Sequence, residues 1–205
     1  MPLRGKTKHD VVLEFRHAEI LNAARKLFAH KGFNEASVEE IARAAGVAKG
    51  TVYLYYPSKR DLYWQALKGG LVAMCEDLEK QVRAAGSTES KIRVFMAAKL
   101  RYFDENRDFF KIYYSEFGNA LLQQAWVEED FEQYHFRQMR LLAEALREGM
   151  RNRTLRNLPV DETAFAILNL TRGVITQRLL EWTRNRLEDD IEFIFDLTWK
   201  GLAGK

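Results

Sequence analysis

Apolar residues recur along most of this chain at the spacing of an α-helix. Between about residues 11 and 31, for example, Ile20, Ala24 and Phe28 fall on one stripe, and Gly32 is placed to end the helix. The same period predicts further helices over about residues 58–84, 88–105, 108–118, 128–152, 160–184 and 188–203. Only three prolines and few runs of β-branched residues also favour helices over strands. The pattern therefore predicts an all-α fold.

A shorter segment near the N-terminus predicts two brief helices instead of one long one. Ser37 is a suitable N-cap, and Glu40 completes a capping box for a helix that Gly46 ends. A second short helix is predicted over residues 48–56, before a Pro-Ser pair at 57–58. Two short helices joined by a tight glycine turn form a helix-turn-helix, whose second helix can enter the major groove of DNA. The segment predicts a DNA-binding protein.

Several residues of this segment resemble the TetR family of bacterial transcriptional regulators. They are Ile41, Ala42, Ala45, Gly46, Val47, Gly50, Thr51, Tyr53, Tyr55, Ser58, Lys59 and Leu62. The resemblance covers about residues 16–65, and Ala48 departs from it because the family often has a Ser cap there. It implies a three-helix DNA-binding head over residues 1–65 and a six-helix body over residues 66–205 that binds an effector and forms a homodimer.

The predicted DNA contacts come from the second short helix and its flanks. Lys49 stands at the helix start, where it can reach a phosphate or a guanine edge, and Gly50 permits close approach of the backbone. Val52 and Tyr56 are expected to point into the head core, and Lys59 is placed to contact a phosphate at the start of the next helix. The predicted DNA-binding set, implied in part by the resemblance, is Ser37, Lys49, Gly50, Thr51, Tyr53, Leu54, Tyr55 and Lys59.

Aromatic residues concentrate in the predicted body. Residues 95–136 hold 12 of the chain's 25 aromatic side chains. Their spacing fits either a cavity for a small molecule or a bulky core, and the resemblance favours a pocket. His135 is either a core residue or a ligand contact, and Arg172 pairs either with a ligand carboxylate or with an acid across a dimer interface. The candidate ligand-binding residues are Met74, Met96, Leu100, Phe103, Phe110, Tyr113, Tyr114, Phe117, His135, Met139, Leu168 and Arg172.

The last two predicted helices carry large apolar residues at regular spacing. Two copies of such a helix pair can form a four-helix bundle, which would present the paired recognition helices to a palindromic operator. The candidate dimer-interface residues are Leu168, Ile175, Leu179, Ile191, Phe195 and Trp199.

Charge and cysteine usage narrow the class of protein. The net charge of +3 divides into +4 over residues 1–65 and −1 over the remainder, which fits a basic DNA-binding module. Arg4, Lys6 and Lys8 could reach phosphates or a minor groove as an arm, or they could form a solvated tail. The single cysteine, Cys75, excludes an intramolecular disulfide and suits a reducing compartment. Without a signal peptide or a membrane-length apolar run, we expect a cytoplasmic protein.

Two other classes of helical protein are a metal-dependent enzyme and an adaptor that does not bind DNA. Glu14-His17 and Glu132-His135 have the spacing found in di-iron bundles, but two further inward glutamates would be needed. We therefore expect no enzyme, no cofactor and no metal site. A helical adaptor that does not bind DNA would not need the helix-turn-helix residues. The sequence predicts a homodimeric repressor that a small, largely apolar ligand releases from double-stranded DNA, with an activator or a protein-controlled regulator left open.

Overall fold

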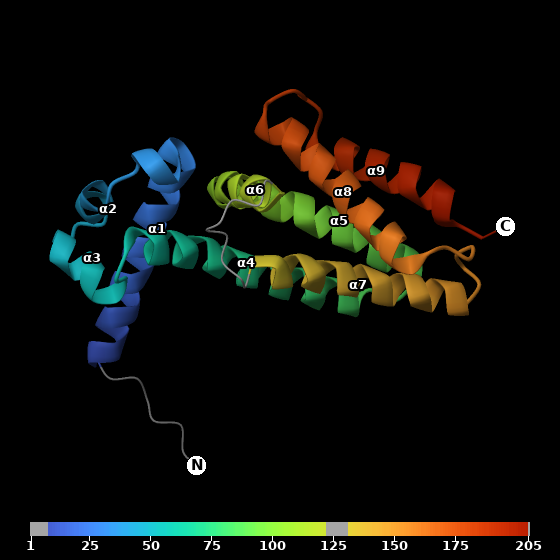
Figure 1. Cartoon of the computed structure of the whole chain (residues 1–205). Helices are drawn as coiled ribbons and strands as arrows, with labels where there is room; N and C mark the ends of the chain where they lie inside the picture. Colours follow the sequence, from blue (N-terminus) through green and yellow to red (C-terminus); the bar gives the residue numbers. More distant parts are fainter. Residues whose placement is uncertain (1–7, 122–130, 205) are drawn as a thin grey trace, which may run out of the picture. The chain divides into compact units, whose positions relative to one another are not determined.

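A computed structural model describes residues 8–121 and 131–204, apart from the side chains of residues 8–14, 116, 117 and 119–121. Over these ranges the chain forms nine α-helices, which confirms the predicted all-α class. The helices are α1 (Lys8–Glu35), α2 (Val38–Ala44), α3 (Lys49–Tyr55), α4 (Lys59–Ala84), α5 (Thr88–Glu105), α6 (Arg107–Leu121), α7 (Phe131–Arg151), α8 (Val160–Leu179) and α9 (Leu187–Leu202) (Figure 1). None of them, within the described ranges, has both the length and the apolarity of a bilayer span.

Two sequence predictions fall outside this description. Arg4 and Lys6 of the predicted arm precede the first described residue. The start of the helix predicted from residue 128 also lies outside the described residues, and α7 is described from Phe131.

The helices divide into two compact units. The head unit comprises residues 1–70 and 108–125, and the body unit comprises residues 71–107 and 126–205. The head unit includes α6 as well as the helix-turn-helix. Phe109 of α6 packs on Gly70, where a Cβ atom would lie 2.3 Å from the ring. The predicted boundary between a head over residues 1–65 and a body over residues 66–205 stays a prediction.

The head unit is built around the stripe of α1 that the sequence predicted. Ile20 and Phe28 are buried. Gly32 then breaks the helix with a left-handed φ of 76°, as its position predicted. Beyond the break, Phe33 meets the edge of Tyr63 with ring centroids 5.1 Å apart. The aromatic contact anchors the chain that leads into α2 against the first turns of α4.

The body unit contains α5, α7, α8 and α9 around a shared apolar core. A Cβ atom at Gly149 of α7 would lie 2.6 Å from Thr88 Cγ2 and 2.7 Å from Leu155 Cγ, so the start of α5 and the loop after α7 pack directly on this glycine. Leu155 also forms an isolated β-bridge with Ala203, just after α9. These contacts join the end of α7 to the start of α5 and to the chain just after α9.

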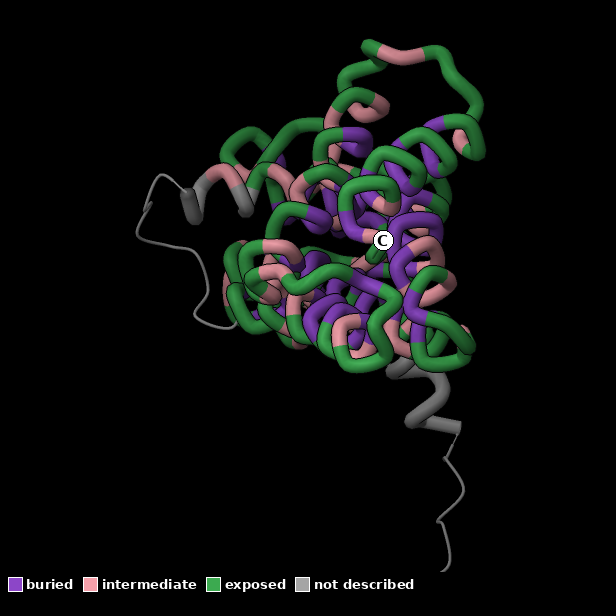
Figure 2. Tube along the Cα trace, turned by 90° about the vertical axis from the view of Figure 1, so that its right-hand side faces the viewer, coloured by how far each residue is buried: buried purple, intermediate pink, exposed green. Residues whose placement is uncertain are grey.

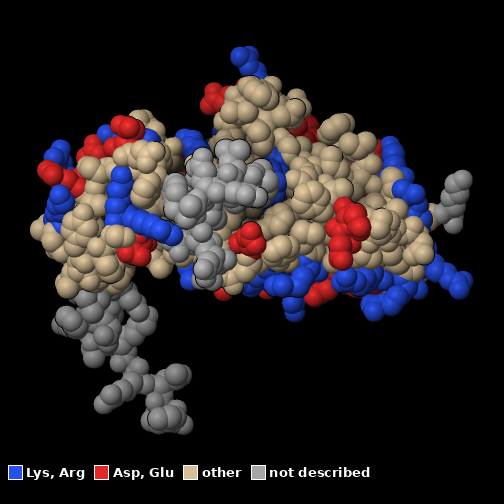
Figure 3. Space-filling view, in the orientation of Figure 1, with Lys and Arg blue, Asp and Glu red and all other residues tan. Residues whose placement is uncertain are grey.

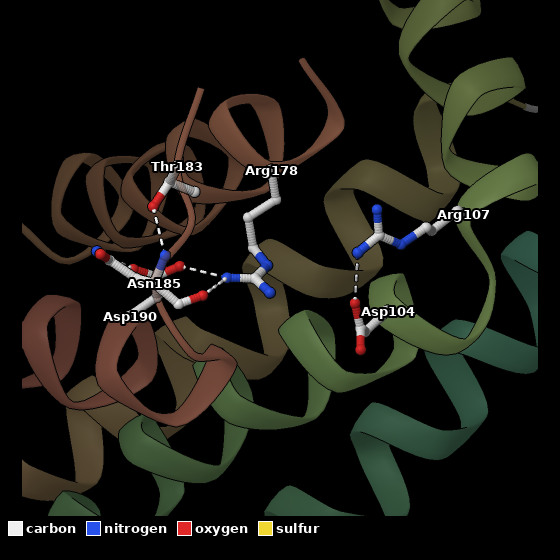
Figure 4. Close-up of polar contacts among 6 residues, drawn as sticks. All are labelled: Asp104, Arg107, Arg178, Thr183, Asn185 and Asp190. Atoms are coloured by element: carbon white, nitrogen blue, oxygen red, sulfur yellow. Dashed lines mark hydrogen bonds and ion pairs between the residues drawn. The ribbon is translucent and has the colours of Figure 1, made fainter. Parts of the chain in front are cut away.

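The connection between α8 and α9 differs from the sequence prediction, which extended α8 to residue 184. The helix stops at Leu179, and Glu181 adopts a left-handed φ of 56°. Arg178 Nη1 donates to Asp190 Oδ2 at 2.6 Å, and Asn185 Nδ2 donates to Asp190 Oδ1 at 3.0 Å (Figure 4). This buried ion pair joins the end of α8 to the first turns of α9. Periodicity could not predict it because the partners belong to different helices.

Candidate DNA-binding helices and a buried basic cluster

The N-terminus of α2 carries the predicted capping box. Ser37 Oγ accepts a hydrogen bond from Glu40 N at 3.2 Å, and Ser37 N donates to Glu40 Oε2 at 3.1 Å. Lys31 Nζ donates to Glu40 Oε1 at 2.6 Å. These hydrogen bonds, first from Lys31 and then from Ser37, stabilise the carboxylate and lower the pKa of Glu40 to about 2. Ser37 therefore fixes the start of α2, and its contact with DNA stays a prediction.

A tight turn joins α2 to α3. Ala45 is the C-cap of α2, and Gly46 has a φ of 65°, which a residue with a side chain rarely adopts. Val47 N donates to Ala42 O at 3.0 Å across this turn. At the start of α3, Ala48 supplies no side-chain cap. The first amides of α3 are thus left without a side-chain acceptor from the N-cap.

The two faces of α3 separate as the sequence predicted. Val52 is buried, as is Tyr56 just after the helix, so both belong to the head core. Leu54, by contrast, is 79% exposed and Tyr53 is 43% exposed. Of the other predicted DNA-binding residues, Lys49 and Gly50 are exposed, and Thr51, Tyr55 and Lys59 are partly exposed. The turn and the core contacts thus hold α3 so that Lys49, Tyr53 and Leu54 face outward.

A contact from α1, which sequence reasoning missed, holds the end of α3. His17 Nδ1 lies 3.0 Å from Tyr56 Oη, and the His17 ring meets that of Tyr55 with centroids 4.2 Å apart. Burial raises the pKa of Tyr56 to about 12, with a smaller contribution from Tyr55, so its hydroxyl stays protonated. Tyr55, predicted to face DNA, therefore has one side of its ring against α1.

Lys59 has partners within the head. Its Nζ donates to Asn34 O at 3.0 Å and lies 4.7 Å from the centroid of the Phe33 ring. These contacts direct the ammonium towards the chain between α1 and α2. An ammonium has three donors, so a phosphate contact remains compatible with this geometry and stays a prediction.

The candidate ligand-binding residues are divided between the two units. In the body unit, five are fully buried: Met74, Met96, Leu100, Phe103 and Leu168. His135, Met139 and Arg172 of the same unit are partly buried. In the head unit, Phe110 and Tyr113 are buried with ring centroids 5.9 Å apart, and Tyr114 is partly exposed. The side chain of Phe117 lies outside the described residues. An effector pocket stays a prediction.

A buried lysine that sequence reasoning missed lies in the body core. Lys99 of α5 is 1% exposed, and its Nζ donates to Gln138 Oε1 of α7 at 2.6 Å. Gln138 Nε2 in turn donates to Tyr134 O at 3.0 Å. Burial, followed by the charge of Arg172, lowers the pKa of Lys99 from 10.5 to about 7. We name Lys99, His135 and Arg172 the basic cluster.

The other members of the basic cluster come from α7 and α8. Burial, then the charges of Arg172 and Lys99, lowers the pKa of His135 to about 4, so this imidazole is neutral at pH 7. Arg172 Nη1 donates to Asn169 Oδ1 at 2.9 Å. Cys75 of α4 is also close to Lys99; it is buried, and this burial raises the pKa of its thiol to about 11.

The helix-turn-helix segment of this chain is similar in sequence to known proteins. A sequence profile described as "Bacterial regulatory proteins, tetR family" matches residues 20–66, which include α2, α3 and the flanking parts of α1 and α4. Residues 20–66 thus match the TetR family. The fatty acid metabolism regulator protein of Bacillus subtilis (strain 168) is 28% identical over 82 residues, 40% of this chain and 42% of that protein. The chain aligns with less than half the length of the first curated relatives that it matches.

Solved structures resemble this chain over nearly its whole length. The TetR family transcriptional regulator PfmR from Thermus thermophilus is 25% identical, with a TM-score of 0.73 and coverage of 88% of this chain and 97% of that one. The transcriptional regulator FadR from Bacillus subtilis, solved in complex with stearoyl-CoA, is 19% identical, with a TM-score of 0.78 and coverage of 90% and 98%. The second likeness concerns the fold alone.

The structure corrects which residues of α8 and α9 face outward. Four of the candidate interface residues are buried within the protomer: Leu168, Ile175, Ile191 and Phe195. Leu179 and Trp199 are partly exposed. Along the helices, buried residues lie on one side and exposed residues on the other (Figure 2). The stripe predicted from the sequence is the buried one. The outer row contains Phe165, Leu170, Phe193 and Leu197, and much of the visible face over α8 and α9 is uncharged (Figure 3).

Of the two pairs with di-iron spacing, Glu132-His135 does not face inward together, because Glu132 is exposed. The side chain of Glu14 in the other pair lies outside the described residues. Over the part of the chain that is described, no group of three or more His, Cys, Asp or Glu residues is arranged to hold a metal.

Proposed function

We propose that this protein is a sequence-specific DNA-binding transcriptional regulator, acting as a repressor that a small molecule releases from its operator. The observation that carries the proposal is the outward row of α3, from Lys49 to Leu54, held by the capped α2, the Gly46 turn and the buried Val52. Such a helix fits the major groove, where lysine and tyrosine side chains contact phosphates and base edges. The family profile over the same residues supports this reading.

The regulator would act as a homodimer through the outer row of α8 and α9. This row has exposed Phe165, Leu170, Phe193 and Leu197, which a monomer would leave in contact with water. Two copies related by a twofold axis would bury the row in a four-helix bundle. The same axis would present two α3 helices to the half-sites of a palindromic operator.

The proposed effector is largely apolar and carries an anionic group. The apolar part is supported by the candidate ligand residues of the body core, and the anionic part by the basic cluster beside them. The FadR structure that shares this fold was solved with stearoyl-CoA, which is a long acyl chain with a charged end. As a regulator of bacterial genes, the protein would act in the cytoplasm, where the operator DNA lies.

Selection of bound duplexes from a random pool tests the DNA-binding proposal. The full-length protein should enrich one palindromic sequence, with affinity that falls steeply as salt rises, because lysines of both protomers displace counterions. Lys49→Ala should weaken binding and alter the preferred sequence, whereas Lys59→Ala should weaken all duplexes alike. Lys80→Ala, which removes an exposed lysine of α4 outside the head, is the control and should bind as the wild type does. A protein that enriches no sequence would overturn the proposal.

A further inference from the structure

Lys99 is an unusual residue for a protein core. Its side chain is 1% exposed, and its ammonium donates a hydrogen bond to a neutral amide oxygen, Gln138 Oε1, at 2.6 Å. Among the described residues it forms no ion pair, and no carboxylate contributes to its electrostatic surroundings. A buried lysine ammonium without a negative partner is costly. A methionine of similar length would fill the same space without that cost.

Among the described residues, the titratable groups that affect Lys99 add positive charge or remain neutral. Arg172 from α8 lies close enough to lower the pKa of Lys99, and His135 from α7 lies close enough to be affected by both. Cys75 from α4 is protonated, since burial raises its pKa to about 11. Three helices therefore place basic groups around one point of the body core, where a negative charge would be stabilised.

The surroundings of this point are apolar and adaptable. Met96 and Phe103 lie about one helical turn from Lys99 on either side along α5, and both are fully buried. Met139 follows the Gln138 partner on α7 and is partly exposed. Methionine side chains change conformation at low cost, so a ligand can enter such a core by displacing them. An occupant would meet hydrocarbon around its body and cations at one end.

We propose that Lys99, together with Arg172, is the anchor for a carboxylate group of the effector. The inference rests on the proposed effector-controlled function and names the chemistry that its binding site recognises. The carboxylate accepts the Lys99 hydrogen bond in place of, or together with, Gln138. A guanidinium and an ammonium together match the two oxygens of a carboxylate, and the apolar part of the effector lies among the methionine and aromatic side chains.

This anchor couples effector binding to proton uptake. In the free protein Lys99 is largely neutral above pH 7, because its pKa is lowered to about 7. A bound carboxylate favours the charged ammonium and raises that pKa, so the complex takes up a proton from solution. Carboxylate affinity should therefore fall by up to about tenfold per pH unit between pH 7 and 9. A lysine with a purely structural role would give no such dependence.

Calorimetric titration of the full-length protein tests the anchor. The probes are straight-chain carboxylates of eight to eighteen carbons, the matching primary alcohols, and the matching coenzyme A thioesters, each measured at pH 8 in buffers of different ionisation enthalpy. At least one carboxylate should bind about tenfold or more tightly than its alcohol, with proton uptake. Lys99→Met should remove both the preference and the uptake. Lys99→Arg, which stays charged, should keep the preference and lose the uptake.

Lys91→Met is the matched control, since Lys91 also lies on α5 but pairs with Glu148 at 2.5 Å. It should retain both the preference and the uptake. Helical circular dichroism and operator binding show that each variant is folded. The anchor would be refuted by acids and alcohols that bind equally, by acid preference that survives in Lys99→Met, or by a panel in which no acid binds. If an alcohol or a thioester released the operator equally well from the wild type and from Lys99→Met, the anchor would be refuted and the proposed function would stay intact.

Discussion

The head and body units place their most distinctive chemistry in opposite environments. In the head, Lys49, Tyr53 and Leu54 stand exposed on a short helix whose position is fixed from behind by the buried Val52. In the body, Lys99 is enclosed in the core. The head thus presents a surface that is complete before any partner arrives, as DNA recognition by a rigid helix requires. The body holds a charge that an unidentified negative group would stabilise.

Two titratable groups show what this difference means for energy. Glu40 of the head is partly exposed, and hydrogen bonds from Lys31 and Ser37 lower its pKa to about 2. Lys99 of the body is buried, and the loss of hydration lowers its pKa to about 7. The first shift reports a satisfied charge and the second a charge that the fold disfavours. A satisfied charge stabilises the fold, whereas a disfavoured charge is a candidate for function.

The largest expected effect compares an exposed leucine in each unit. Leu197→Glu in α9, 55% exposed, should place like charges in the proposed dimer interface, leaving monomers that no longer bind the operator. Leu54→Glu in α3, 79% exposed, should abolish operator binding and leave the dimer intact. Light scattering and gel retardation measure the two outcomes. A dimeric Leu197→Glu variant would place the interface elsewhere.

A smaller effect is expected when a buried charge of the body loses its partner. Asp190→Ala leaves Arg178 in a site where the paired side chains are 9% and 12% exposed, so the free energy of unfolding should fall by about 3–5 kcal/mol. Asp196→Ala removes the partner of Lys200 from an exposed pair and should cost less than about 1 kcal/mol. Urea unfolding measures both. Equal costs would show that burial does not govern ion-pair energy in this unit.

Removal of the disfavoured charge should stabilise the protein. The pKa of Lys99 is about 7 in the folded state and 10.5 without the fold, so the unfolded chain binds more protons between these values. Wild-type stability should therefore rise as pH increases from 7 to about 10. Lys99→Met should remove this rise and add about 1–3 kcal/mol to the free energy of unfolding at pH 7.

Urea unfolding at pH 7 and pH 9.5 measures this change, with Lys80→Met, an exposed lysine of α4, as the control. The control should follow the wild type at both pH values. If Lys99→Met were less stable than the wild type at pH 7, the Lys99 ammonium would stabilise the body core, as the Glu40 carboxylate stabilises the head.

The smallest effect concerns the satisfied charge of the head. Ser37→Ala removes the two hydrogen bonds that the Ser37 hydroxyl makes with Glu40, and it should lower the free energy of unfolding by about 1 kcal/mol. Ser115→Ala, at an exposed position inside α6, should be neutral. Because the pKa of Glu40 is lowered from 4.5 to about 2, its stabilising contribution is present above pH 4.5 and lost as pH falls towards 2. Unfolding at pH 7 and pH 3 measures both; a Ser37→Ala protein as stable as wild type would show that the cap is dispensable.

The head was predictable from sequence because its determinants are local. The Ser37–Glu40 capping box, the left-handed Gly46 and the inward Val52 each follow from residues a few positions apart, and the structure confirms all three. The contact of His17 with Tyr56 was not predictable, since 39 positions separate the two residues.

The body was predictable as a set of helices but not in its details. Lys99 lay in the apolar stripe of Met96 and Phe103, and its spacing alone would have marked it as a buried charge. The α8–α9 stripe was found, but periodicity cannot tell a face turned to the protomer's own core from one turned to a partner. Phe195 was therefore assigned outward, although it is buried and lies under the Arg93 guanidinium, 3.8 Å from the ring centroid.

The most direct test of the account measures effector and operator binding on the same protein. Hexadecanoate affinity is determined for the free protein and for its operator complex, and operator affinity is determined with and without saturating hexadecanoate. The acid should weaken operator binding about tenfold or more, and the operator should weaken acid binding by the same factor, as linkage requires. Operator affinity that is unchanged at saturating acid would contradict the central claim that the body controls the DNA-binding head.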